Sequence, residues 1–394
     1  MKHLIGIVAL AGALTSAGTA LAQTVKIGVV NTYTGVVAAT FGEFVERAMR
    51  LYMKLNPDKL PPGVKVELIF RDDGGPNPEK AKQLAQELIV RDKVQLLTGM
   101  IATPNALAIA PLATEAKMPT MIMNAGGSVI TTRSPYMARV SFTLWQSAYP
   151  LGQWAAKKYK KSFILVSDYS PGHDAEEAFS KSFKEGGGEI IGTIRAPLMT
   201  QDFTPYMQRV KDQKPESLMI FVPAGKTATQ LMKAFGDLGL PQAGIKLIGP
   251  GDITTDEELP GMGDTPLGVI TAHHYSSAGD RPANKAFVAA WKKEYGEKAL
   301  VNFVAVAAWD GMDAIYTAIR EQKGVIDPEK TMEIWKKWSN PDSPRGPISI
   351  DPATRDIVQN IYLREVRKVS GQLINFELET IGTAVKDPFK EFKK

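Results

Sequence analysis

The sequence contains no cysteine. Disulfide bonds, thiolate nucleophiles and the lipid-anchored cysteine of a lipoprotein are therefore excluded. Stability must come from a buried core instead. A chain of 394 residues with 44% hydrophobic content is long enough to build such a core, and its length predicts roughly two to three domains.

Long apolar runs are scarce beyond the N-terminus. Charged residues, glycine or proline interrupt each later apolar stretch within about a dozen positions, short of the roughly 20 residues that a membrane helix needs. The first residues differ, because Met1, Lys2 and His3 precede an apolar run at 4–14 and small residues lead to Ala22. This pattern is typical of a secretory signal peptide. We expect cleavage after Ala22 and a soluble mature protein in the periplasm.

Charge of one sign is not in excess, since 47 basic residues face 42 acidic ones for a net charge of +5. So diffuse a charge does not indicate a nucleic-acid partner. Lysines gather at 390–394, and we interpret that segment as a solvated chain end. Only four histidines are present, which leaves little scope for histidine-based catalysis.

Motifs of enzymes with α/β folds are missing or incomplete. No Gly-x-Ser-x-Gly elbow occurs, and no glycine-rich dinucleotide fingerprint follows a predicted strand. Residues 225–227 (Gly-Lys-Thr) resemble the end of a Walker loop, but the first glycine of that motif falls on Ile220. His273 and His274 are neighbours, so on a strand they would point to opposite faces and would not share a metal ion. We predict a protein that is not an enzyme and holds no cofactor or metal.

Short β-branched runs alternate with longer segments of helical period, which predicts an α/β fold with parallel sheets covered by helices on both faces. The predicted strands are 25–30, 64–70, 94–99, 119–124, 162–167, 217–222 and 268–274. The predicted helices are 41–55, 80–91, 105–117, 174–185, 227–238, 282–295, 304–320 and 329–338. Asn77 and Pro78 open the second helix as N-cap and first helical residue.

The strand-helix rhythm runs twice, up to about residue 139 and again from about 162 to 251, which indicates two similar lobes. The segment from Pro341 to Pro352, followed by a strand-like run from Ile357, indicates a late crossing between them. The predicted division is a signal peptide at 1–22, a first lobe at 23–139 plus 273–350, and a second lobe at 140–272 plus 351–394.

Several stretches, beginning at Ile27, Arg71, Ala106, Ser167, Asp202 and Leu231, together resemble the leucine/isoleucine/valine-binding family of solute-binding proteins of ABC importers. The resemblance covers nearly the whole mature chain. It implies the type I periplasmic binding fold, with two Rossmann-like lobes joined by three hinge crossings and closing over a small ligand. It also implies a membrane permease and an ATPase as partners, and we expect a monomer.

The site is expected outside the carboxyl ends of the strands, where helix N-termini offer free amide donors. In the family the turn after the third strand grips the ligand carboxylate with a hydroxyl and backbone amides. Here that turn carries Ala102 and Thr103, although a plain N-cap role for Thr103 is compatible with the same position. Asn124, Ala125 and Gly126 match a second carboxylate-binding loop. Gly126 stands where the family usually has threonine, so only backbone donation is expected there.

Aromatic residues complete one wall of the expected cleft. Phe41 occupies the place of an aromatic that lines the family's cleft, with core packing as the alternative. Trp145 and Tyr169 fall near other cleft-lining stretches, and core or interlobe packing is the alternative for Trp145. His274 and Tyr275, at the end of the strand 268–274, are also included.

Gly251 and Asp252 follow a probable strand of the second lobe. Amino-acid binders in the family carry a carboxylate near the position of Gly251, which pairs with the ligand ammonium because a buried unpaired cation is costly. Gly251 cannot do so. Asp252 would serve after a one-residue shift, and a turn role is the alternative.

The missing ammonium partner and the added aromatics resemble the family branch that binds aromatic carboxylates such as benzoate or hydroxycinnamate derivatives. The chain is therefore predicted to capture a small organic carboxylate by cleft closure. Binding of branched-chain or other amino acids by the same mechanism stays open, as does a ligand-sensing receptor with this fold.

Overall fold

The computed structural model describes residues 23–35 and 38–393, so the predicted signal peptide lies outside the described residues. Five parallel strands form the first sheet, in the order β2-β1-β3-β4-β5. They are β1 (Gln23–Asn31), β2 (Val64–Asp72), β3 (Leu96–Gly99), β4 (Thr120–Ile122) and β5 (Met137–Arg139).

The second sheet has the order β11-β12-β13-β10-β9-β8-β6-β7, and β14 pairs with β13. Its strands are β6 (Lys161–Ser167), β7 (Glu189–Ala196), β8 (Ser217–Phe221), β9 (Lys246–Pro250), β10 (Ile270–His273), β11 (Ser339–Asn340), β12 (Ile348–Ile350), β13 (Ile357–Val369) and β14 (Gln372–Val385). Strands β6 to β10 run parallel to their neighbours among themselves, whereas β13 is antiparallel to β10, β12 and β14.

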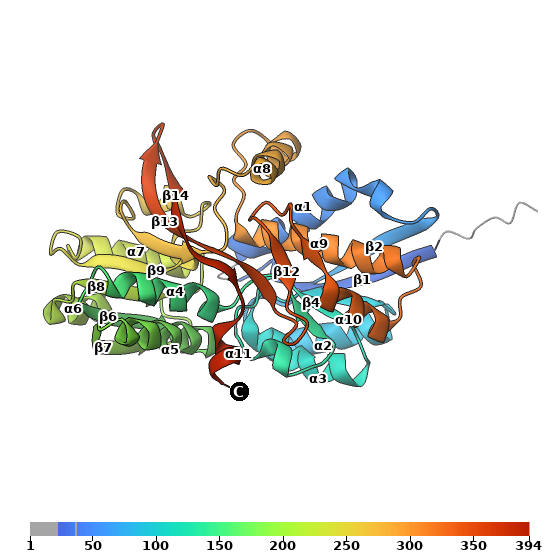
Figure 1. The fold of residues 1–394 in the computed structure, drawn as a ribbon, viewed down its shortest axis with the longest axis horizontal. Helices are drawn as coiled ribbons and strands as arrows, with labels where there is room; N and C mark the ends of the chain where they lie inside the picture. Colours follow the sequence, from blue (N-terminus) through green and yellow to red (C-terminus); the bar gives the residue numbers. More distant parts are fainter. Residues whose placement is uncertain (1–22, 36–37, 394) are drawn as a thin grey trace, which may run out of the picture.

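Helices cover both sheets (Figure 1). The α-helices are α1 (Ala38–Leu55), α2 (Pro78–Val90), α3 (Thr103–Glu115), α4 (Leu144–Ala156), α5 (Ser170–Glu185), α6 (Thr204–Gln213), α7 (Lys226–Asp237), α8 (Pro282–Tyr295), α9 (Phe303–Glu321), α10 (Pro328–Lys337) and α11 (Pro388–Phe392). Short 3-10 turns are η1 (Pro57–Lys59), η2 (Ile130–Thr132), η3 (Gly251–Thr254) and η4 (Leu259–Met262). The predicted cap of α2 is confirmed, because the Asn77 side chain accepts a hydrogen bond from the amide of Lys80 and Pro78 begins the helix.

Side-chain alternation along the strands explains the layers. In β6, Phe163 and Leu165 join the core shared with α6 and α7, whereas Ile164 and Val166 join the core shared with α4 and α5. Successive residues of a strand point to opposite faces, so a strand buried on both sides reads as a continuous apolar run. The predicted α/β fold, with parallel sheets and helices on both faces, is confirmed.

The chain passes between the two sheets three times. It leaves the first sheet after β5 to form α4 and β6, and it returns after β10 to α9, which packs on α1. It then enters the second sheet through β12 and β13, the segment predicted as a late crossing. Figure 1 shows α9 and α10 in the same half of the molecule as β1 and β2, and β13 and β14 projecting from the other half.

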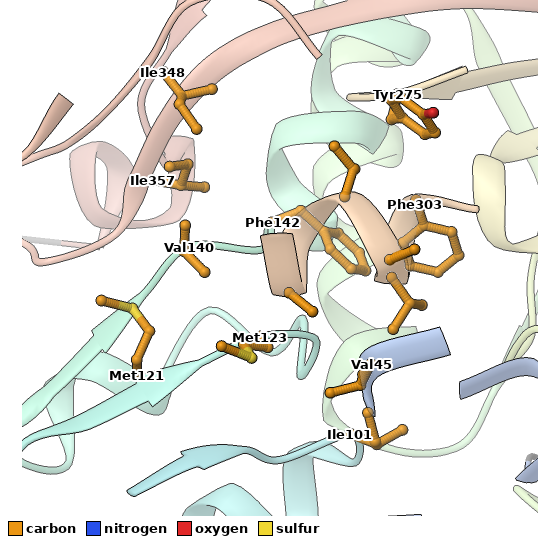
Figure 2. Close-up of a cluster of buried hydrophobic side chains, with 14 of the residues drawn as sticks. Val45, Ile101, Met121, Met123, Val140, Phe142, Tyr275, Phe303, Ile348 and Ile357 are labelled. Carbon is orange, nitrogen blue, oxygen red and sulfur yellow. The ribbon is translucent and has the colours of Figure 1, made fainter. Parts of the chain in front are cut away.

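One apolar cluster contains residues of both sheets and of the chain crossings (Figure 2). Phe142, just past β5, and Phe303, at the start of α9, face one another edge to face with ring centroids 5.7 Å apart. Val140 and Ile357 come from the first and third crossings and lie in the same cluster. Among the described residues, no helix is long and apolar enough to span a membrane.

Buried ion pairs tie the crossings together. Arg345 donates to Asp310 of α9, to the carbonyl oxygen of Ser141 on the first crossing and to the side chain of Gln359 in β13. Arg139 donates to Asp356 at 2.8 Å, and Lys390 of α11 also pairs with Asp356. We call the side chains of Arg139, Asp310, Arg345, Asp356, Gln359 and Lys390 the junction network.

Candidate functional site: a cavity at the strand ends

A cavity of about 170 Å³ lies at the carboxyl ends of the strands of both sheets. Each strand from β1 to β9 contributes a residue within a few positions of its end. From the first sheet these are Gly35, Gly74, Pro76, Ile101, Ala102, Thr103, Asn124, Gly126 and Phe142; from the second they are Tyr169, Pro171, Leu198, Met199, Phe221, Pro223, Ala224 and Asp252. Phe41, Leu144 and Thr227 come from helix starts. Parallel strands place their ends at one edge, so this is where a ligand of an α/β sheet binds.

Most of the predicted site residues are brought together in this cavity. They are Phe41, Ala102, Thr103, Asn124, Gly126, Tyr169 and Asp252. Phe41 is 4% exposed and its ring meets Phe303 edge to face at 6.3 Å, so it lines the cavity and packs in the core at once. The two interpretations of Phe41 do not exclude one another.

Five predicted residues lie outside the cavity lining: Ala125, Gly251, Trp145, His274 and Tyr275. Ala125 turns inward, and its amide donates to the carbonyl oxygen of Met100. Gly251 is pressed against the ring of His273 and the guanidinium of Arg364, so that a side chain added there would collide with both. The next residue, Asp252, lines the cavity, whereas Gly251 does not.

The third of these residues, Trp145, belongs to the core of the second half of the molecule. Its ring lies 6.4 Å from Tyr149 of the same helix and 5.9 Å from Phe392 of α11. The indole is 1% exposed. The structure thus follows the packing alternative for Trp145, which anchors the C-terminal helix on α4.

His274 and Tyr275 also lie outside the cavity lining, and one expectation about the histidines is wrong. The rings of His273 and His274 do not point to opposite faces but lie with centroids 4.3 Å apart. Strand β10 ends at His273, so the alternation of a strand no longer applies to His274. Burial holds the pKa of both imidazoles well below the usual value. The ring of His274 stacks on Phe142 at 5.2 Å, behind the cavity wall.

Several apolar lining residues were not predicted from the sequence. Phe142, Phe221 and Leu144 form walls, and Phe221 stacks on Tyr169 with ring centroids 6.1 Å apart. Thr227 is the second residue of α7 and lines the cavity. It belongs to the Gly-Lys-Thr segment, for which the sequence indicates only an incomplete Walker loop. Its place after β8 and before a helix is the signal that would have identified it.

Helix starts supply the electrostatics of the cavity. The N-caps of α3, α5 and α7 are Ala102, Tyr169 and Gly225, and none of these three makes a side-chain cap hydrogen bond. The first amides of a helix lack acceptors inside the helix and carry partial positive charge. All three helices begin at the cavity, so the partial positive charge of their N-termini favours an anion there.

Thr103 and Asn124 add side-chain groups on the side of the first sheet. The Thr103 hydroxyl oxygen accepts a hydrogen bond from the amide of Gly127 at 3.1 Å, which leaves its own proton free to donate. The Asn124 amide group donates to the carbonyl oxygen of Ile101 at 2.9 Å, while its Oδ1 has no protein partner. Both residues are at most 7% exposed. On this side of the cavity, the Thr103 hydroxyl is therefore available as a donor to a carboxylate.

Asp252 gives the side of the second sheet a different character. Burial raises its pKa to about 7, and its Oδ2 has no protein partner. Burial and the neighbouring Asp252 also raise the pKa of the Tyr169 phenol well above its usual value. A carboxyl group here repels an anion when it is ionised, so it opposes a second carboxylate at this end.

Few ionisable side chains are found in the described lining of the cavity. No lysine, arginine or histidine is among the lining residues of the described chain. Within residues 23–35 and 38–393, no group of three or more His, Asp or Glu side chains is placed to hold a metal ion. Aromatic walls, free amides and single polar groups are the features of a binding site.

This fold and cavity define a two-lobed binding protein, and comparison with known families agrees. The periplasmic binding protein family matches residues 24–372, and the chain belongs to that family. The predicted resemblance is thereby confirmed. The Leu/Ile/Val-binding protein homolog 6 of Brucella melitensis is 42% identical over 380 residues, which cover 95% of this chain and 96% of that protein.

Two solved structures of solute-binding proteins are similar over almost their full length. The protein from Rhodopseudomonas palustris BisB5, in complex with 3,4-dihydroxybenzoic acid, is 48% identical with a TM-score of 0.88, covering 93% of this chain and 99% of that one. A second R. palustris protein, in complex with 4-hydroxybenzoate, is 43% identical with a TM-score of 0.89, covering 94% and 100%. Both are described as solute-binding proteins of ABC transporters.

Proposed function

We propose that this protein is the periplasmic solute-binding component of an ABC importer and captures a small aromatic carboxylate. The observation that carries the proposal is a cavity with aromatic walls at which three helices begin without side-chain caps. Its volume of about 170 Å³ suits one ring with short substituents, because clefts for drug-sized ligands measure roughly 300–1,000 Å³. The ligands of the two R. palustris proteins are of this class.

The ligand carboxylate is placed against the start of α3. There it accepts from the hydroxyl and the amide of Thr103 and from the amide of Gly126, because Pro104 has no amide hydrogen and the amides of Asn105 and Ala106 donate to the carbonyl oxygen of Ala102. The ring then lies among the side chains of Phe41, Phe142 and Phe221, which line the cavity. Offset or edge-to-face contacts with these rings contribute about 0.5–1.5 kcal/mol each beyond area burial.

Capture is proposed to proceed by closure of two lobes. The first comprises 23–139 plus 273–350 and the second 140–272 plus 351–394. The two sheets support this division, except that the short strands β11 and β12, which fall in 273–350, belong to the second sheet. Ser128, after β4, donates its amide to Asp174 of α5 at 2.8 Å, a contact between the proposed lobes beside the cavity.

A second candidate is an amino acid, as the name of the Brucella relative suggests. Asp252 favours it in one respect, since its unpartnered oxygen offers an acceptor for an ammonium group. The aromatic walls favour a flat ring instead. Neither candidate involves turnover, and we propose that the protein is not an enzyme.

Export and assembly complete the proposal. The N-terminal segment is proposed to direct secretion to the periplasm and to be cleaved after Ala22. The loaded monomer would then deliver its ligand to a membrane permease driven by an ATPase. Nucleic acid is not a proposed partner.

Isothermal calorimetry of the mature chain tests the function directly. Benzoate, 4-hydroxybenzoate, a hydroxycinnamate and leucine are titrated into protein that has been unfolded and refolded to remove any carried-over ligand. Binding of the aromatic acids with compaction in solution scattering is expected. Tight binding of leucine without binding of any aromatic acid contradicts the proposal and supports the second candidate.

A further inference from the structure

Asp252 lines the cavity from the second sheet, whereas the proposed carboxylate site lies on the side of the first sheet. We infer that its carboxyl group accepts a hydrogen bond from a ring hydroxyl of the ligand, so that the protein selects aromatic acids hydroxylated opposite the carboxylate. This inference rests on the proposed function. It assigns the 4-hydroxyl to Asp252 as the residue that distinguishes hydroxylated from unsubstituted rings.

Asp252 has a carboxyl oxygen that is free to accept a hydrogen bond. The residue is 6% exposed and lines the cavity, yet its Oδ2 has no protein partner. A buried polar atom without a hydrogen bond costs free energy of about 1–3 kcal/mol, and native proteins retain few of them. The oxygen is thus available to a donor that enters the cavity.

The neighbouring guanidinium of Arg364 does not bond to this oxygen. Arg364 is 3% exposed and donates to the carbonyl oxygens of Tyr275 and Gly251 and to the hydroxyl of Thr271. These three hydrogen bonds hold the guanidinium in place. Its positive charge favours the ionised form of Asp252, although the two side chains form no ion pair.

The positions of Asp252 and Thr103 determine the orientation of the proposed ligand. Asp252 follows β9 in the second sheet, whereas Thr103 follows β3 in the first sheet, so the two polar groups approach the cavity from opposite sides. A ligand carboxylate is attracted to the start of α3 and repelled by Asp252. Its far end must therefore offer a donor or a neutral group to Asp252.

The separation of the polar groups within the ligand distinguishes a hydroxylated aromatic acid from an α-amino acid. In an α-amino acid the ammonium is attached one carbon away from the carboxylate, so both charges occupy the same end of the molecule. The side chains of Phe41, Phe142 and Phe221 line the same cavity and give it an apolar surface. A ring packs on that apolar surface and places a 4-hydroxyl at the far end of the ligand, where it donates to Asp252.

Calorimetry with matched ligands tests the inference through a ratio of dissociation constants, benzoate over 4-hydroxybenzoate. A hydrogen bond to a carboxylate predicts a ratio of about tenfold or more for the unaltered protein. Asp252→Ala is expected to bring the ratio close to one while the affinity for benzoate changes little. Asp252→Asn keeps an acceptor oxygen in the same shape and is expected to retain an intermediate ratio.

The control is Asp237→Ala, which removes an equal charge from the exposed end of α7, where Asp237 pairs with Lys233. Its ratio should equal that of the unaltered protein. A ratio near one before mutation, or one unchanged in Asp252→Ala, overturns the inference and leaves the proposed function standing. If no aromatic acid binds at all, both fail. Thermal unfolding of each variant verifies that it is folded before its ratio is used.

Discussion

The junction network and the cavity lie side by side, and both bury polar side chains, yet they differ in how those groups are partnered. In the junction network, Arg345 donates to four acceptor groups and Arg139 to Asp356 and two carbonyl oxygens. In the cavity, no basic side chain lies among the described lining residues, and Asn124 and Asp252 each keep an oxygen without a protein partner. Asp310 Oδ1 of the junction network has no partner either, but its Oδ2 is paired with Arg345. The first region holds the chain crossings in place. The second has polar groups that await a ligand.

Arg139 connects the two regions. Its Nη1 donates to the carbonyl oxygens of Ala125 and Gly127 at 3.0 and 2.7 Å, on either side of the lining residue Gly126. The junction network therefore orients the loop whose backbone faces the cavity. A preorganised binding loop needs such support, because a ligand that must order its own site binds less tightly.

The largest expected effect comes from breaking the junction network at Arg345. In Arg345→Met, the buried Asp310 carboxylate loses its cation, and such losses cost about 3–5 kcal/mol. The free energy of unfolding, measured by urea denaturation, should fall by that amount. Arg367→Met, which breaks an exposed pair with Glu365, should cost about 0.5 kcal/mol or less. Equal losses in the two variants would contradict the contrast between the regions.

Removing the Thr103 hydroxyl should damage binding more than stability. In Thr103→Val the ligand carboxylate loses a donor, and hydrogen bonds to charged groups are worth about 1.5–3 kcal/mol. We expect the affinity for benzoate to fall at least about tenfold by calorimetry. Thr114→Val, on the same helix but bonded to Ser134 outside the cavity, should leave affinity unchanged. An equal loss in both variants would remove Thr103 from the site.

Asp252 should make stability depend on pH. Because its pKa rises from 3.8 to about 7, the folded protein keeps a proton that the unfolded chain releases, and stability falls as the pH rises through this window. Asp252→Asn abolishes that loss. We expect it to gain about 4 kcal/mol in free energy of unfolding at pH 8 and about 0.5 kcal/mol or less at pH 4. A gain that is the same at both values would show that Asp252 ionises normally.

The contact between the lobes should have the smallest effect. Asp174→Ala removes the acceptor of the Ser128 amide, a loss of about 1 kcal/mol. If this contact forms on closure, affinity should fall about fivefold with little change in the association rate, as followed by stopped-flow fluorescence. The matched variant is Glu177→Ala on the exposed face of the same helix. An affinity of Asp174→Ala equal to that of Glu177→Ala would contradict a role in closure.

Sequence reasoning found the elements that carry a clear periodic signal and missed those that do not. Helix α4 was not predicted because it is buried on nearly all sides, so no polar face marks its period. Its capping box, formed by Thr143 and Gln146, was the available signal. Helix α6 was missed for the opposite reason, since only Met207 and Val210 are buried in an otherwise polar segment.

The same distinction holds for the candidate site. Polar residues in loops after strands, such as Thr103, Asn124 and Asp252, were predicted because their chemistry is visible in the sequence. The walls Phe142 and Phe221 were not, because an apolar side chain lining a cavity has the same character as one in the core. His274 was misplaced because the end of β10 fell one residue earlier than expected.

The most direct test of the central claim is a crystal structure of the mature protein with 4-hydroxybenzoate. The account predicts the carboxylate within hydrogen-bonding distance of the Thr103 hydroxyl and the ring among the aromatic walls. A carboxylate that faces Asp252, or a ring bound outside this cavity, would contradict it.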